Sequence, residues 1–145
     1  MENKELIRQL LEREHYDFED LVSVVRVLRG EGGCPWDREQ THKSIRNDII
    51  EETYEVIEAI DTDDPVLLRE ELGDVLLQVV FHARICEEDG QFDVNQVTDG
   101  ICRKLIHRHP HVFADVCADT SEEVLNPTEF CSSTRKTATS NHQST

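Results

Sequence analysis

Two pairs of acidic residues have a spacing that could hold a metal ion. Glu52 and Glu55 stand three residues apart, and so do Glu71 and Asp74. Residues three apart are neighbours on one face of a helix. The segments that carry the two pairs are joined by only a few residues, DTDD, so we expect an antiparallel helical hairpin.

The positions of the pairs also predict how they meet across this hairpin. Glu55 and Glu71 are symmetric about residue 63, inside the turn, and the same holds for Glu52 with Asp74. Symmetric positions lie at the same height in an antiparallel hairpin, so each acid should face one from the other helix. Four carboxylates held so close repel one another unless a cation neutralises them. Oxygen ligands suit Mg²⁺ first and Mn²⁺ second.

Two other interpretations of these acids remain open. They could be solvated groups on the outer faces of two helices, which are common in so acidic a chain. A carboxylate-bridged di-iron site needs an ExxH pair on each of two helices. The sequence offers Glu12 with His15 and Glu39 with His42. Neither pair matches the central carboxylates in height, so we favour magnesium.

Helical periodicity and punctuation predict an all-α fold, a bundle of about five helices with the hairpin at its centre. Asp37, with Gln40 in the capping-box position, should begin the helix that carries the first acidic pair and runs to about residue 61. Asp64 and Pro65 should begin the next helix, which Gly90 closes. The remaining helices are expected near residues 3–15, near residues 17–29 and from Asp93 to Pro110, with an ordered loop at residues 30–37.

Length and composition set further limits. The 145 residues predict one domain at residues 1–125 and a disordered, Ser/Thr-rich tail at residues 126–145. The formal net charge of −16 repels a polyanion, which argues against duplex nucleic acid as a partner. No apolar run approaches the length of a membrane span, and the N-terminus lacks the features of a signal peptide. We therefore expect a cytoplasmic protein without membrane contact, whose five cysteines are reduced.

Four motifs follow one another along the chain: GCPWDREQTH at 33–42, EETYEV at 51–56, EELGDVLLQVVFHA at 70–83 and RHPHVFAD at 108–115. In this order they resemble the MazG family of nucleoside triphosphate pyrophosphohydrolases, over roughly residues 16–125. The resemblance implies hydrolysis of nucleoside and deoxynucleoside triphosphates to the monophosphate and pyrophosphate. It also implies assembly into dimers or higher oligomers, and magnesium ligation by Glu52, Glu55, Glu71 and Asp74.

The resemblance suggests roles for further residues. A basic pair that contacts the phosphates would correspond to Lys104 and Arg108, which share a helix face. Trp36 could stack on the nucleobase, although an anchor that holds its loop to the core is the favoured interpretation. Either Glu55 or Glu51 could take the proton of the attacking water.

The alternative function is a catalytically weak nucleotide-binding or dimerisation module left from a truncated two-domain enzyme. Long members of the family carry a second related domain, whereas this chain ends at residue 145. His107 also stands where the family usually has Arg. For the histidines of HRHPH, which are His107, His109 and His111, a turn-stabilising or phosphate-proximal role is expected rather than a metal site.

Overall fold

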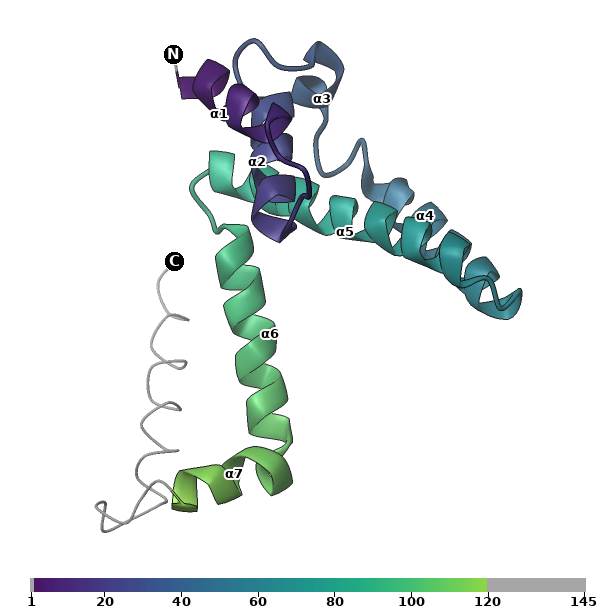
Figure 1. The fold of residues 1–145 in the computed structure, drawn as a ribbon, viewed down its shortest axis with the longest axis vertical. Helices are drawn as coiled ribbons and strands as arrows, with labels where there is room; N and C mark the ends of the chain where they lie inside the picture. The colour runs from purple at the N-terminus through teal and green to yellow at the C-terminus, as the bar shows by residue number, and fades with distance from the viewer. Residues whose placement is uncertain (1, 120–145) are drawn as a thin grey trace. The chain divides into compact units, whose positions relative to one another are not determined.

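The computed structural model describes residues 2–119, with the side chains of residues 3–114, and helices are the only regular secondary structure in this range (Figure 1). The predicted all-α fold is confirmed, with seven helices in this range where about five were expected. The predicted tail at residues 126–145, and the domain end at residue 125, lie outside the described residues. None of the described helices is long and apolar enough to cross a membrane. The helices are α1 (Glu2–Leu11), α2 (Phe18–Arg29), α3 (Pro35–Glu39), α4 (Arg46–Asp61), α5 (Pro65–Glu88), α6 (Val94–Arg108) and α7 (Pro110–Asp119).

The chain divides into two compact units, one up to Val97 and one from Thr98 onward. In the first unit the main packing contact is between α4 and α5, which run side by side (Figure 1). Helix α2 packs against α5, and both α1 and α3 pack against α2. The buried core of this unit comes mostly from α5, with Val25, Ile45 and Val94 from the other elements.

The turn between α4 and α5 is fixed at both ends by backbone hydrogen bonds. Asp63 has a positive φ of 52°, the left-handed conformation that ends many helices. The amides of Asp63 and Asp64 donate to the carbonyls of Ile60 and Ala59, which completes a Schellman motif. The Asp64 side chain then accepts from the amides of Val66 and Leu67, so the predicted N-cap of α5 is confirmed. Three residues separate the two helices, in agreement with the short connection that the sequence predicts.

The segment before α4 differs from the prediction. Asp37 does not begin the helix of the first acidic pair, because it lies in the short helix α3, inside a segment expected to be a loop. Pro35 is tolerated there because it occupies the first turn, where its missing N–H leaves no bond unmade. Helix α4 begins only at Arg46, after a turn in which the backbone amides of Thr41 and Ser44 each donate to the other residue's hydroxyl.

Arg29, at the end of α2, holds this segment in place. Its guanidinium donates to the carbonyls of Asp37 and Gln40 at 2.7 and 3.0 Å, and makes two bonds with the carboxylate of Glu88 on α5. It also lies over the ring of Phe81, 5.2 Å from the centroid. The Arg29 side chain is only 6% exposed. The guanidinium of Arg29 therefore joins α2, α3 and α5.

Gly33 is required for the close approach of this segment to α2. A Cβ atom at this position would collide with the carbonyl oxygens of Val27 and Leu28. The amide of the next residue, Cys34, donates to the same Leu28 carbonyl at 2.9 Å. Any larger residue at position 33 would therefore push the segment away from the end of α2.

The ends of α5 and α6 are set by local signals. Gly90, with φ of 70°, closes α5 as predicted. Asp93 and Gln96 exchange bonds between their side chains and backbone amides at the start of α6. In the second unit, Pro110 was expected to end a helix. Helix α6 does end just before this residue, at Arg108, and Pro110 is also the first residue of α7, a position that suits proline.

We predict that Arg29→Lys destabilises the protein by about 2 kcal/mol, because a lysine cannot replace both the two-bond contact with Glu88 and the two carbonyl bonds. Chemical denaturation of the metal-free chain measures this free energy. Arg26→Lys, on the same helix, is the matched control. Arg26 makes only a more exposed 3.6 Å ion pair with Glu87, so its cost should stay below about 0.5 kcal/mol. Equal costs for the two variants would contradict the role given to Arg29.

Candidate metal centre

Three carboxylates from the two helices of the hairpin converge. One ligand oxygen each from Glu52 on α4 and from Glu71 and Asp74 on α5 lie within 4.8 Å of one another. Among the described side chains, no other group of three or more His, Cys, Asp or Glu residues converges this closely. The di-iron alternative therefore gains no support, since neither His15 nor His42 joins such a group.

The electrostatic coupling among the acids follows the predicted register. Burial raises the pKa of Glu52, and the largest charge effect on it comes from Asp74, which is its predicted partner. Burial likewise raises the pKa of Glu71, and the largest charge effect comes from Glu55, again the predicted partner. Glu71 is only 7% exposed, an unusual position for a carboxylate that pairs with no basic group among the described side chains. The hairpin therefore places like charges together at a cost to stability.

The donor set fits a hard divalent cation. Its ligands are carboxylate oxygens only, without nitrogen or sulfur, which suits Mg²⁺ or Mn²⁺ better than a softer metal. Glu55 lies outside the group of three, although its charge raises the pKa of both Glu52 and Glu71. Glu51 is exposed and has the smallest of the effects on Glu52. Of the two candidate bases, Glu55 is thus the one more closely coupled to the site.

Sequence reasoning did not single out Asp48 as a neighbour of the site. Asp48 lies one turn before Glu52 on α4, and its charge contributes to the raised pKa of Glu52. Its mirror position about residue 63 is Gln78, whose side-chain oxygen is buried without a hydrogen-bond partner. Helical spacing could have found Asp48, since residues four apart share a helix face just as residues three apart do.

Trp36 does not anchor its loop to the core, contrary to the favoured interpretation. Its side chain is 75% exposed, whereas the segment is held by Arg29 and by the close approach at Gly33. The aromatic face is therefore open to a ligand, and stacking on a nucleobase stays a prediction.

The predicted basic pair lies in the second unit. Lys104 and Arg108 are one turn apart on α6, and both are exposed. Their contact with phosphate stays a prediction. His109 has the turn-stabilising role expected of this segment, because its Nδ1 bonds to the Leu105 carbonyl at 2.6 Å beyond the end of α6.

An apolar hollow lies near the tip of the hairpin rather than at the carboxylates. Its volume is about 380 Å³, and it is open to solvent. The lining residues are Ala59, Ile60, Asp63, Asp64, Pro65 and Leu68. Because no basic or aromatic side chain lines it, we assign the chemistry to the acidic cluster and not to this hollow.

The structure is that of an all-helical domain in which carboxylates from two helices of an antiparallel hairpin converge, an arrangement that could hold a hard divalent cation. Comparison with known proteins identifies the family: residues 40–113 match the MazG nucleotide pyrophosphohydrolase domain. The chain belongs to this family, which confirms the resemblance seen in the sequence motifs.

The most similar relatives include proteins named for the family activity. The chain is 56% identical over 98 residues to the nucleoside triphosphate pyrophosphohydrolase/pyrophosphatase MazG of Thermotoga maritima, covering 68% of this chain and 38% of that protein. It is 52% identical over 106 residues to the nucleoside triphosphate pyrophosphohydrolase of Escherichia coli K12, covering 72% and 40%. An uncharacterised Bacillus subtilis protein, YabN, is 50% identical over 111 residues, covering 77% and 23%. The chain thus spans less than half the length of these relatives.

We predict that Glu52→Gln stabilises the metal-free protein by roughly 0.5–1 kcal/mol at pH 7, because it removes like-charge repulsion with Asp74 and Glu55. The raised pKa means that folded Glu52 binds protons more readily than unfolded Glu52. The wild-type penalty is therefore present at neutral pH and shrinks as the pH falls towards 4.5, the ordinary pKa. The gain from the substitution should shrink with it.

Thermal denaturation at several pH values measures this gain, and Glu58→Gln, an exposed acid on the same helix, is the control. With Mg²⁺ present the wild type should become the more stable of the two proteins, since a ligand at 100 times its dissociation constant stabilises by about 2.7 kcal/mol. The wild type should gain this stability and the Glu52 variant should not. A magnesium response that survives the substitution would remove Glu52 from the site.

Proposed function

We propose that this protein is a magnesium-dependent pyrophosphohydrolase that converts nucleoside and deoxynucleoside triphosphates into the monophosphate and pyrophosphate. The observation that carries the proposal is the convergence of Glu52, Glu71 and Asp74 between the helices of the hairpin, in a chain of the MazG family. Carboxylates so placed destabilise the fold unless a cation neutralises them. A role in clearing unwanted nucleotides from the cellular pool fits this activity.

Glu52, Glu71 and Asp74 would hold the Mg²⁺ ion, with Glu55 as a fourth ligand, and Mn²⁺ would substitute. When bound, the ion supplies positive charge to the phosphate oxygens and makes water more acidic. The rest of the chemistry belongs to the side chains. A carboxylate accepts the proton of the attacking water while the α–β phosphoanhydride bond breaks and pyrophosphate leaves. We assign this to Glu55, with exposed Glu51 as the alternative.

The substrate contacts would come from three further side chains. Lys104 and Arg108 carry the positive charge that a triphosphate requires. Trp36 offers an exposed aromatic face for the nucleobase. Because the hairpin itself is strongly acidic, it would repel the free triphosphate, so these basic residues and the metal ion together would make binding favourable.

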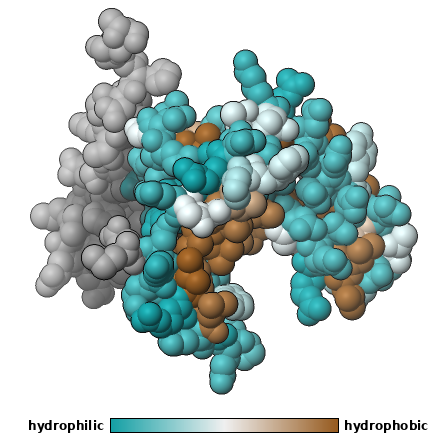
Figure 2. All heavy atoms as spheres, turned by 90° about the horizontal axis from the view of Figure 1, so that it is seen from above, coloured by the Kyte–Doolittle hydropathy of each residue, from teal (hydrophilic) through white to brown (hydrophobic). Residues whose placement is uncertain are grey.

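The exposed side chains and the net charge suggest which partners the protein has. Large apolar side chains of α4 and α5 are exposed, among them Ile50, Tyr54, Val66 and Leu72, and apolar atoms reach the surface at several places in Figure 2. Such side chains favour an interface, and we propose a homo-oligomer, a dimer or larger.

The net charge of −16 argues against duplex nucleic acid as a partner. We place the protein in the cytoplasm, away from membranes.

The deciding experiment is pyrophosphate release from a panel of ribo- and deoxyribonucleoside triphosphates, with Mg²⁺ and with a chelator. We expect magnesium-dependent release. Glu71→Gln should lower kcat by more than the roughly 10–100-fold that a residue supporting a metal ligand contributes. The matched control is Glu70→Gln, which changes the exposed acid next to Glu71 on α5; Glu70 is not one of the three converging carboxylates, so kcat should stay nearly unchanged.

Comparing Glu55→Ala with Glu51→Ala then separates the two candidate bases, because only the loss of the base should remove the fall of kcat at acidic pH, where the base is protonated. If folded wild-type protein releases no pyrophosphate from any triphosphate yet still binds one, the enzymatic proposal fails. A catalytically weak nucleotide-binding or dimerisation module would then be the function.

We predict that Lys104→Ala and Arg108→Ala each raise the KM for triphosphates by about tenfold or more, because each removes a charge-assisted bond worth about 1.5–3 kcal/mol. Steady-state kinetics measures the change. Arg103→Ala is the control, since the Arg103 guanidinium already bonds to Asp99 at 2.8 Å. An equal effect of all three variants would mean that only the net charge of the helix matters.

A further inference from the structure

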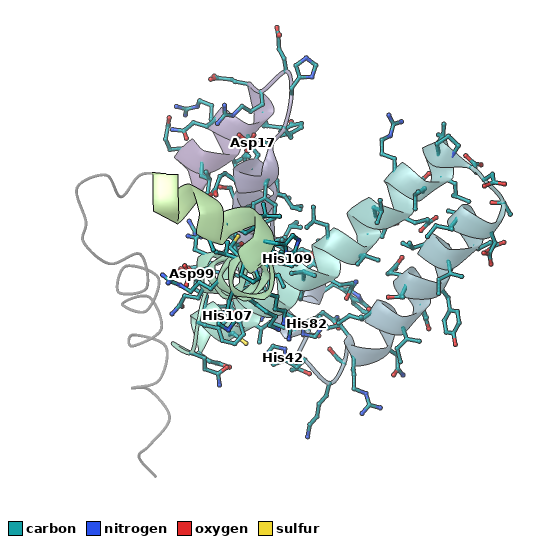
Figure 3. All side chains as sticks on the ribbon, turned by 90° about the horizontal axis from the view of Figure 1, so that it is seen from below. Asp17, His42, His82, Asp99, His107 and His109 are labelled. Atoms are coloured by element: carbon teal, nitrogen blue, oxygen red, sulfur yellow. The ribbon has the colours of Figure 1, made fainter. Side chains whose placement is uncertain are left out.

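Two histidines outside the carboxylate cluster share a close contact. His42 comes from the segment between α3 and α4, and His82 lies on α5 (Figure 3). Their rings are parallel to within 2°, with centroids 5.0 Å apart. The two Nδ1 atoms are 2.7 Å apart, a hydrogen-bond distance. Because both atoms are ring nitrogens, the contact requires one proton between them: one Nδ1 must donate and the other must accept.

The other atoms of the cluster favour one arrangement of protons. His42 Nε2 lies 3.4 Å from the sulfur of Cys86, and His82 Nε2 is buried without a hydrogen-bond partner. If His82 donates from Nδ1, its buried Nε2 is a bare lone pair, and His42 donates from Nε2 to sulfur. The opposite arrangement would bury an N–H without an acceptor, which proteins avoid more strictly. We therefore assign the Nδ1–H form to His82 and the Nε2–H form to His42.

The position of His42 matters because α4 begins without a side-chain cap. The N-cap residue, Ile45, makes no side-chain hydrogen bond to the helix. Arg29 holds the earlier part of the segment. Directly before α4, two contacts hold it against α5: Ile45 is buried in the core, and His42 bonds to His82. Glu52 follows Ile45 by two helical turns on the same helix. A shift at the start of α4 would therefore move Glu52 relative to Asp74.

We propose that His42 and His82 form a clamp that positions the start of α4 on α5 through one shared proton, and so keeps Glu52 in register with the other metal ligands. A second proton, taken from solvent, would place N–H against N–H at 2.7 Å, and the pair would have to separate. The affinity of the carboxylate site for Mg²⁺ then falls at low pH beyond the loss caused by protonation of the acids. This inference rests on the proposed metal site.

The charges around the pair fit this behaviour. Burial lowers the pKa of His82, the neighbouring His42 lowers it further, and Asp48 on α4 opposes them in part. The Cys86 thiol beside His42 stays neutral, since burial and Asp89 raise its pKa. Glu88, two residues after Cys86 on α5, is also charged, and its carboxylate is paired with Arg29. The folded chain thus binds fewer protons at His82 than the unfolded chain, so stability falls as the pH drops through the ordinary pKa of 6.5.

Nitrogen-15 NMR of the histidine rings in the full metal-free chain tests the clamp without any metal or turnover. We expect an Nδ1–H signal from His82 and an Nε2–H signal from His42 at neutral pH. As the pH is lowered, uptake of a second proton by the pair should change the signals of both rings together, because the two rings share one proton at neutral pH. Independent titration of His42 and His82, or the Nε2–H form in both, would overturn the proposal.

His42→Asn tests the consequence for the metal site. The amide oxygen that this substitution introduces near the place of Nδ1 accepts a hydrogen bond from His82 whether or not His82 is charged, so it retains the contact without a second titrating ring. Calorimetry gives the Mg²⁺ dissociation constant at about pH 7.5 and at about pH 5.8. We expect the wild-type affinity to fall with pH by about fivefold or more beyond the fall in the variant.

His15→Asn is the matched control and should behave as the wild type. His42→Leu removes the contact altogether and should weaken Mg²⁺ binding at both pH values. Circular dichroism identifies a variant that fails to fold, in which case the asparagine variant and the NMR titration decide. The same pH dependence in the wild type and in His42→Asn would overturn the positioning role. If the wild type binds no Mg²⁺ at all, the proposed metal site fails, and the NMR titration still decides whether the clamp exists.

Discussion

The candidate site depends on the three-residue turn between α4 and α5. Asp63 adopts the left-handed conformation, and the side chain of Asp64 caps α5, so the turn has one fixed length. A helix rotates each side chain by about 100° per residue. One residue more or less in the turn would carry Glu71 and Asp74 away from the face of α4. The local hydrogen bonds of the turn therefore determine whether carboxylates from two helices meet.

Convergence of these acids opposes folding, and the apolar contacts of the hairpin must offset it. Glu71 is buried beside other carboxylates, and the pKa values of Glu71 and Glu52 are raised for that reason. Ile45 and Phe81, whose positions are also symmetric about residue 63, pack in the core at the other end of the same hairpin. The metal-free protein thus carries a cost at its centre, which a divalent cation would convert into a gain.

Two side chains from outside the hairpin complete its support. Arg29 ties the segment before α4 to both α2 and α5, and His42 on His82 holds the last part of that segment. Both contacts join residues that are 40 or more positions apart in the chain, namely Arg29 with Glu88 and His42 with His82. The start of α4 lacks its own cap, so these distant contacts take the place of a local signal. The position of Glu52 therefore depends on contacts made throughout the first unit.

The sequence alone determined whatever rests on near neighbours: the all-α class, the capped start of α5 at Asp64, its end at Gly90 and the register that brings Glu52 towards Asp74. These follow from helix periodicity and short-range hydrogen bonds. Tertiary structure decided the rest. Asp37 satisfies the capping pattern, yet Arg29 binds its carbonyl within α3, so α4 begins nine residues later. Trp36 is exposed because an arginine and a glycine hold its loop. The His42–His82 contact has no pattern in the sequence, since packing between distant segments creates it.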